Sequence, residues 1–205
     1  NWQYLNYFFL FFFIVSKITY SQSDGTDFWY ILSPEFRFDL SDKFEIRLRA
    51  FEGFLLNNSA SNNTIRFGRS ELMVGYNHKQ FDFFAYVKRR TTGEMWIGPR
   101  VDYTNRFFDN KLSIHAHYRY FTGLNSYSAD HQYLVTLFDY KLTNTFRPGI
   151  LGYNRHEFGS KPLVFYGPSV TTIFAKKSAV LLSYMKCLTF PKTYLTMIAI
   201  IISVN

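Results

Sequence analysis

The sequence predicts an all-β fold, an antiparallel up-and-down transmembrane β-barrel of about 10 strands, or about 12, since bacterial single-chain barrels favour even numbers. Three observations predict it: apolar and polar residues alternate along most of the chain, the alternating segments are long, and the composition suits two-faced strands. Hydrophobic residues make up 47% of the 205 residues and aromatic residues 21%, yet the mean hydropathy is only -0.12. Such fine alternation does not suit a bundle of transmembrane helices, and the length suits one domain.

The first 21 residues read as a signal peptide. An apolar run over 4–15 is followed by small residues at Thr19 and Ser21, the positions that a signal peptidase reads, so we expect cleavage after Ser21. The alternative is a retained membrane anchor. We therefore divide the chain into a signal peptide (1–21), an outer-membrane β-barrel (22–188) and an atypical C-terminal segment (189–205).

The barrel segment contains ten predicted strands. Most match or exceed the roughly 9 to 11 residues that a tilted strand needs to cross a bilayer. They are 28–38, 43–56, 64–77, 80–90, 93–104, 110–121, 130–142, 145–155, 161–174 and 177–188.

The segment Lys111–Phe121 shows the pattern most clearly. Its apolar positions, such as Ile114 and Tyr118, alternate with polar positions, such as His117 and Arg119. Aromatic residues gather near the ends of many strands, as membrane interfaces require, and the polar faces carry charges of both signs. From these features we expect the apolar face of the barrel to contact lipid. The expected lumen-facing charged network is Glu45, Arg47, Arg49, Glu71, Glu94, Arg100, Asp102, His115, His117 and Arg119. The girdle is expected to hold Tyr76, Tyr103, Phe107, Phe108, Tyr118, Tyr120, Phe121, Tyr140 and Phe174.

The C-terminal run over 194–204 is apolar on both faces and ends in Val204-Asn205. It suits a closing strand packed on both sides, a short terminal helix, or a tail that does not belong to the barrel.

The formal charge of +8 is spread through the strands, and no basic helix or aromatic RNA-binding signature accompanies it, so we do not expect nucleic acid as a partner. A single cysteine, Cys187, excludes an intrachain disulfide. His115 and His117 share one face of a strand, but a zinc site would need a third ligand from His131, Glu94 or Asp102. We predict no metal and no cofactor.

Catalytic motifs are absent from the sequence. There is no G-x-S-x-G, no H-E-x-x-H and no phosphate-binding glycine loop. Ser113 shares a face with His115, which leaves an outer-membrane lipid hydrolase as an alternative function, although no partner acid can be named. A soluble, secreted, lipocalin-like barrel that binds an apolar ligand is the other alternative, since alternation alone does not say which face points inward.

Segments such as FRFDLSDKFEIRLRAF (36–51) and VDYTNRFFDNKLSIHAHYRYF (101–121) place a tight Asp/Asn/Lys turn beside aromatic-rich strands. Through these strand–turn–strand units, residues 28–188 resemble the small outer-membrane β-barrel proteins of Gram-negative bacteria. The C-terminus departs from the pattern of those proteins. The resemblance implies a location in the outer membrane after export, contact with outer-membrane lipid, and a structural, binding or narrow-channel role. With a basic excess, a conducting barrel would prefer small anionic solutes.

Overall fold

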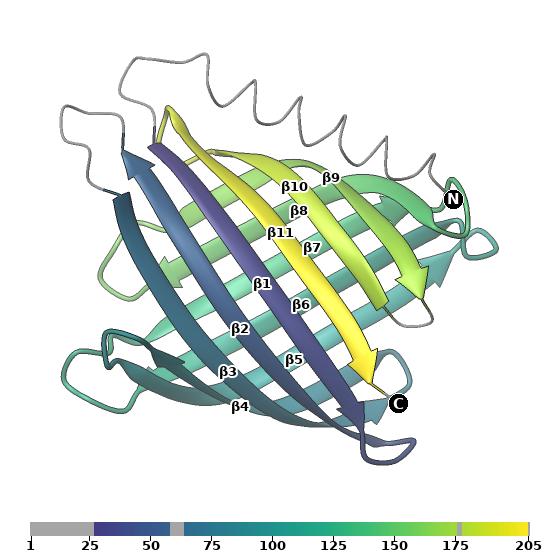
Figure 1. Ribbon diagram of the computed structural model, residues 1–205, viewed down its shortest axis with the longest axis horizontal. Coiled ribbons are helices and arrows are strands. Elements are labelled where there is room, and N and C mark those ends of the chain that lie inside the picture. Colours follow the sequence, from purple (N-terminus) through teal and green to yellow (C-terminus); the bar gives the residue numbers. More distant parts are fainter. Residues whose placement is uncertain (1–26, 58–63, 176–177, 205) are drawn as a thin grey trace.

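The structure is a closed barrel of eleven strands (Figure 1). This computed structural model describes residues 27–57, 64–175 and 178–204. The signal peptide predicted for residues 1–21 lies outside the described residues. In chain order the strands are β1 (Asp27–Asp39), β2 (Phe44–Asn57), β3 (Thr64–His78), β4 (Phe81–Arg90), β5 (Met95–Phe107), β6 (Leu112–Gly123), β7 (His131–Tyr140), β8 (Phe146–Glu157), β9 (Leu163–Ala175), β10 (Ser178–Cys187) and β11 (Thr193–Val204).

Each strand pairs antiparallel with the next, and the barrel closes by a parallel pair between β1 and β11. The register of this pair runs from Asp27 opposite Thr193 to Phe38 opposite Val204. In a meander the strand direction alternates, so an odd number of strands makes the first and last strands parallel. The expectation of 10 or 12 strands is therefore wrong: the chain uses eleven.

The eleventh strand comes from the C-terminal segment whose form the sequence left open. Residues Thr193–Val204 pair with β10 on one side and with β1 on the other, so this segment is a strand and not a helix. Its run of isoleucines favours that outcome, because β-branched side chains prefer extended backbone. No helix among the described residues is long and apolar enough to cross a membrane.

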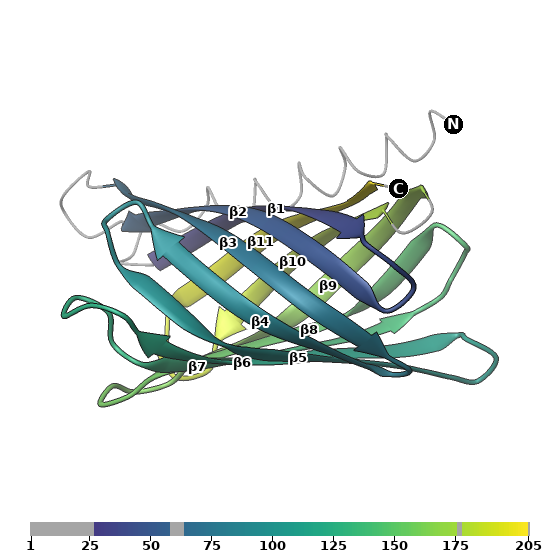
Figure 2. The same cartoon turned by 90° about the horizontal axis from the view of Figure 1, so that it is seen from below.

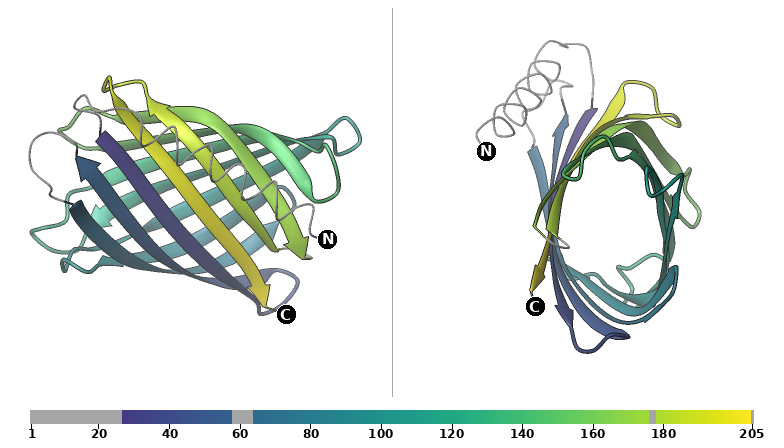
Figure 3. Two further views of the ribbon diagram at one scale, coloured as in Figure 1. Left: turned by 45° about the horizontal axis from the view of Figure 1, so that its top comes forward. Right: turned by 90° about the vertical axis from the view of Figure 1, so that its right-hand side faces the viewer.

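The connections lie at the two ends of the barrel (Figure 2). We call the end where β1 begins the start end, and the opposite end the turn end. The turn end carries the connections 40–43, 79–80, 108–111 and 141–145, and the start end carries 91–94, 124–130, 158–162 and 188–192. Seen from one end, the barrel has an oval outline (Figure 3).

The two faces of the wall differ sharply in chemistry. Large apolar side chains point outward and are exposed, including Leu48, Leu72, Val74, Phe83, Ile97, Leu134, Phe138, Ile150 and Tyr166. Charged side chains on the alternate positions are buried inside, among them Glu35, Glu45, Arg47, Glu71, Lys88, Arg100, Arg119 and Asp139. The barrel thus has apolar residues outside and many charges inside, the reverse of an ordinary soluble core.

Candidate functional site in the barrel interior

The charged interior begins with a row of ion pairs across the first three strands. Arg49 on β2 lies directly opposite Glu35 on β1 and Glu71 on β3. It forms ion pairs with both, through Nη2 to Glu35 and through Nη1 to Glu71 at 3.4 Å. Because period-2 alternation puts all three side chains on the inner face, one guanidinium joins three strands.

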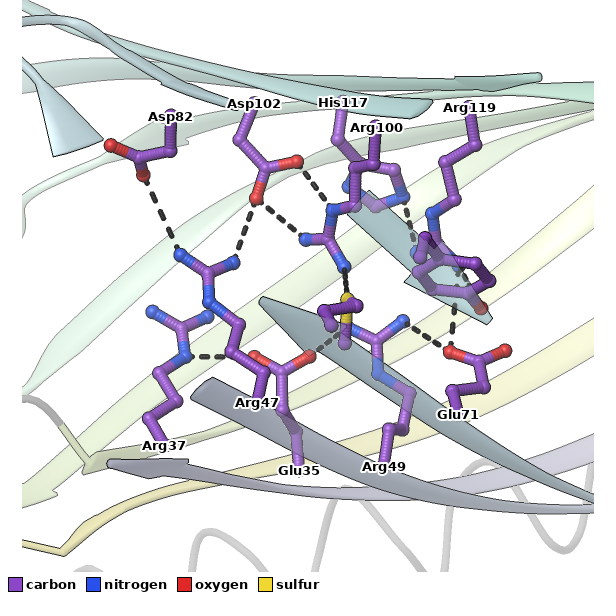
Figure 4. A network of polar contacts seen from close by, with 12 residues as sticks. Glu35, Arg37, Arg47, Arg49, Glu71, Asp82, Arg100, Asp102, His117 and Arg119 are labelled. Atoms are coloured by element: carbon purple, nitrogen blue, oxygen red, sulfur yellow. Dashed lines mark hydrogen bonds and ion pairs between the residues drawn. The ribbon is translucent and has the colours of Figure 1, made fainter. Parts of the chain in front are cut away.

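Arg47 extends the network across the barrel interior to strands that do not touch β2. Its Nη2 lies 2.5 Å from Glu45 on the same strand, while its Nη1 donates to Asp102 on β5 at 2.8 Å. Asp82 on β4 lies 3.5 Å from the same guanidinium. Asp82 and Asp102 sit directly opposite each other, so Arg47 neutralises two like charges that would otherwise repel (Figure 4).

A glycine lies beneath an aromatic ring that Arg47 contacts. The ring of Phe84 lies over Gly75, where a Cβ would come within 2.1 Å of the ring, so only glycine fits there. The Arg47 guanidinium carbon lies 4.2 Å from the centre of the same ring, a cation–π contact.

The remaining strand of the network is β6. Arg100 on β5 binds Asp102 with two donors, at 2.5 and 2.6 Å, and lies opposite Arg119. Arg119 donates to Nε2 of His117 at 2.8 Å and lies 3.7 Å from Glu71. A guanidinium can only donate, so Nε2 of His117 accepts that bond. By the bounds and order of the strands, the network therefore spans six consecutive strands, β1 to β6. Figure 4 shows its side chains.

Toward the start end the interior holds a buried lysine among aromatic rings. Lys88 has no carboxylate partner among the described residues, and its Nζ lies about 4 Å from the ring centres of Trp96 and Phe121. Its Nζ also lies 2.5 Å from Nε2 of His131, whose Nδ1 bonds the carbonyl of Ala129 at 3.0 Å. Since a carbonyl only accepts, Nδ1 carries the proton and Nε2 accepts from the lysine. This cluster fills the start end beside β4–β7.

Strands β7–β11 line the other half of the interior mainly with apolar and hydroxyl side chains, and Asp139 and Arg147 are charged exceptions on β7 and β8. Leu151, Phe165, Met185 and Leu195 form a buried cluster toward the start end. Ser169 and Ser183 lie opposite each other on β9 and β10, and neither hydroxyl finds a hydrogen-bond partner in the described part of the chain. The interior thus has a charged half and an apolar half.

Between the halves lies a cavity of about 520 Å³. Its lining extends toward the turn end of several strands, for example to Arg106 on β5 and Ile201 on β11, and its inner limit includes Phe51, Tyr133 and Leu151. A volume of this size is typical of small-molecule sites.

The residues suspected of catalysis are arranged differently from a hydrolase site. Ser113 is fully buried, and its hydroxyl accepts a bond from Arg147 at 3.3 Å. His115 lies between Thr104, at 3.2 Å, and Asp139, at 3.4 Å. No His115–Ser113 bond is found among the described residues, so the histidine is not placed to activate that serine. His115 and His117 belong to no three-ligand metal cluster within the described ranges.

Most of the predicted network residues lie together inside the barrel, but Glu94 lies apart. It sits in the connection between β4 and β5, where it bonds Thr92 and, at 3.1 Å, Arg90. Burial raises the pKa of the Glu94 carboxyl, but the bonds from Thr92 and Arg90 outweigh it and hold this pKa below its usual value.

Sequence reasoning missed several members of the interior. They are Glu35, Arg37, Arg69, Asp82 and Lys88. Asp82 and Lys88 share the inner face of β4 with Phe84 and Tyr86, so that strand has no purely polar face. The expected girdle residue Phe121 is also inside, fully buried against Tyr86 with 4.7 Å between ring centres. Alternation from Arg119 would have placed Phe121 there.

Comparisons with family models, curated proteins and solved structures find no match for the chain. The fold and the interior chemistry therefore define the molecule only as a closed β-barrel with a cross-strand ion-pair network.

Proposed function

We propose that the chain is an outer-membrane β-barrel protein of structural, binding or narrow-channel type. The observation that carries this proposal is the sidedness of the wall: exposed apolar side chains outside, buried ion pairs inside. The outer residues Leu72 and Val74 are 44% and 46% exposed, whereas Met73 between them is fully buried. In water such a surface is costly, whereas a bilayer is its natural solvent.

Strand length supports the same proposal. The strands run from 10 residues in β4 to 15 in β3, enough for a tilted strand to cross the hydrocarbon region. Closure also leaves no free sheet edge, which a bilayer requires because it offers no hydrogen bonds to unpaired backbone groups. The parallel β1–β11 pair meets this requirement as well as an antiparallel pair would.

The soluble, lipocalin-like alternative fits less well. It needs an apolar interior and a polar exterior, yet six strands carry their charges inward. The lipid hydrolase alternative would need an activated nucleophile that lipid can reach, and Ser113 is buried and bonded to Arg147.

A filled lumen argues against a wide pore. Side chains such as Tyr86, Lys88 and Met185 are fully buried inside, as expected for small barrels. The cavity is lined by eight arginines and four carboxylates, so any current that the barrel carries is expected to prefer anions.

The first test is the location and folding of the expressed chain. We expect it in the outer-membrane fraction of a Gram-negative host, migrating faster on gels before heating than after. Recovery in the soluble fraction without detergent contradicts the proposal. Planar-bilayer recordings should show small, anion-preferring conductance or none, and a large cation-selective pore would contradict the filled lumen.

A further inference from the structure

The interior cavity has two chemically different walls. One is the charged network of β1–β6. The other, from β7–β11, is mainly apolar and includes Leu137, Ile173, Leu181, Met197 and Ala199. A ligand that satisfies both walls must itself be amphipathic.

Arginines with spare donors lie near the turn end of the cavity. Arg106 lines it and has no ion pair within the described ranges. Arg37 binds Glu35 through Nε, at 2.7 Å, and neither of its Nη groups makes a bond within the described part of the chain. Arg147 makes only long contacts, 3.3 Å to Ser113 and 3.5 Å to Asp139. These groups from β1, β5 and β8 suit an anionic head group at the turn end.

The β1–β2 ladder lacks two residue pairs beside this cavity, while its register stays the same on both sides of the gap. In the β1–β2 ladder the register runs through Leu32 opposite Glu52 and resumes at Glu35 opposite Arg49, and the residues between, Ser33 and Pro34, have no partner on β2. A proline cannot donate to a ladder, which accounts for a break at this position.

An outer hollow lies over the break. It has a volume of about 550 Å³, and its lining includes the outer-face residues Leu32, Pro34 and Ala50 together with charged residues such as Glu52 and Arg89. Phe51 and Arg69 line both this outer hollow and the interior cavity. The Arg69 guanidinium stacks on the Phe51 ring at 3.7 Å, so this stacked pair lies where the two spaces come near each other.

We propose that the interior cavity binds a single-chain anionic amphiphile, which reaches it from the membrane through the break at Pro34. The acyl chain lies along the apolar wall of β7–β11, and the carboxylate or phosphate head lies with Arg37, Arg106 and Arg147. The route, unlike the cavity, rests on the proposed membrane location, because it needs lipid beside the outer hollow.

The test uses a photoreactive fatty acid as the probe. The purified chain in phosphatidylcholine nanodiscs is irradiated with dodecanoate carrying a terminal diazirine, or with the matching alcohol, and the labelled residues are mapped by mass spectrometry. We expect dodecanoate to label inner residues of the apolar wall, such as Leu181 and Met197. The alcohol should need a roughly tenfold higher concentration, because it lacks the charge-assisted bonds to arginine.

Matched variants assign the site. Ala199→Trp fills the cavity and should abolish inner labelling, whereas Ile200→Trp, one residue along on the opposite face, should leave it unchanged. The double variant Arg37→Gln with Arg106→Gln should bring dodecanoate down to the level of the alcohol. Heat-dependent gel migration shows that each variant has folded.

The route is tested by rate. Ala50→Trp blocks the outer hollow and should slow labelling of the inner residues without changing its final extent, while Ile46→Trp on the same strand should not slow it. An unchanged rate with Ala50→Trp overturns the route alone.

Labelling confined to outer-face residues, or inner labelling that survives Ala199→Trp, overturns the binding site while leaving the membrane proposal intact. A chain that does not enter nanodiscs contradicts the proposed function and the route instead. The same probe applied to that chain in water then tests the cavity by itself.

Discussion

The two halves of the interior solve the same packing problem in different ways. In β1–β6 nearly every inward guanidinium pairs with a carboxylate, either on its own strand, as Arg100 does with Asp102, or across strands, as Arg49 does between Glu35 and Glu71. In β7–β11 charges are few, with Arg147 beside Asp139 as one example, and most inward positions hold apolar, aromatic, small or hydroxyl side chains; Ser169 and Ser183 lie together without partners in the described chain. The charged half is held by specific pairs that depend on one another, and the apolar half by side-chain volume.

Because of this difference, we expect the largest loss of stability from a substitution in the charged half. Glu71 lies within ion-pair distance of Arg49, Arg69 and Arg119, so Glu71→Leu leaves three buried cations without that partner. We expect a loss of about 3–5 kcal/mol of stability. Urea unfolding in detergent, followed by gel migration, measures it. Glu157→Gln is the control, because Glu157 is 42% exposed and pairs only with Arg155 in the described chain; a loss as large in the control would contradict the account.

A charge placed on the outer face of the wall should cost a similar amount of stability in both halves of the barrel. Leu72→Arg on β3 and Leu134→Arg on β7 both put a charge on an outward position, 44% and 43% exposed. Each is expected to destabilise the barrel by about 2–4 kcal/mol if the position lies near the bilayer midplane. Refolding into lipid vesicles measures the cost. Two variants that fold as well as the parent chain would show that this face does not contact lipid.

A smaller effect is expected at the lysine of the aromatic cluster. Lys88→Met keeps the length and apolar contacts of the side chain but removes its cation–π contacts and the donor to His131. The expected change is within about 1–2 kcal/mol, because no carboxylate among the described residues loses its partner. In the same unfolding experiment, Glu71→Leu should lose clearly more stability than Lys88→Met. The reverse order would mean that the aromatic cluster contributes more to stability than the ion-pair network.

The smallest effect belongs to the apolar half. Ser183→Ala removes a buried hydroxyl that has no partner in the described structure. We expect stability to stay equal or to rise by up to about 1 kcal/mol, since an unsatisfied group is lost. A clear loss of stability in urea would instead reveal a bond that this hydroxyl makes.

The comparison also explains what the sequence could predict. The ten strands of 28–188 follow from alternation, and their ends agree with the structure within a few residues. The faces of β2, β3, β5 and β6 were readable because charges mark the inner side. The face of β4 was not, since Asp82 and Lys88 alternate in step with Phe84 and Tyr86, and pattern alone does not reveal that aromatic rings fill the interior.

The closing strand of the barrel and the full set of network residues were harder to predict from the sequence, for a physical reason. An apolar half of the interior makes β11 apolar on both faces, so alternation there carries no signal. Arg47 meets Asp102 across 55 residues of sequence, and the closed barrel, which no local pattern encodes, brings the two together.

The most direct test of the central claim compares two adjacent residues of β7. Leu137 lines the cavity, whereas Phe138 points outward and is 44% exposed. In a chain whose Trp2, Trp29 and Trp96 are phenylalanine, Leu137→Trp and Phe138→Trp each supply one fluorophore. After reconstitution into brominated phosphatidylcholine, we predict strong quenching of tryptophan at 138 and little at 137. Quenching at 137 but not at 138, or at neither position, would contradict a membrane barrel with its apolar face in lipid.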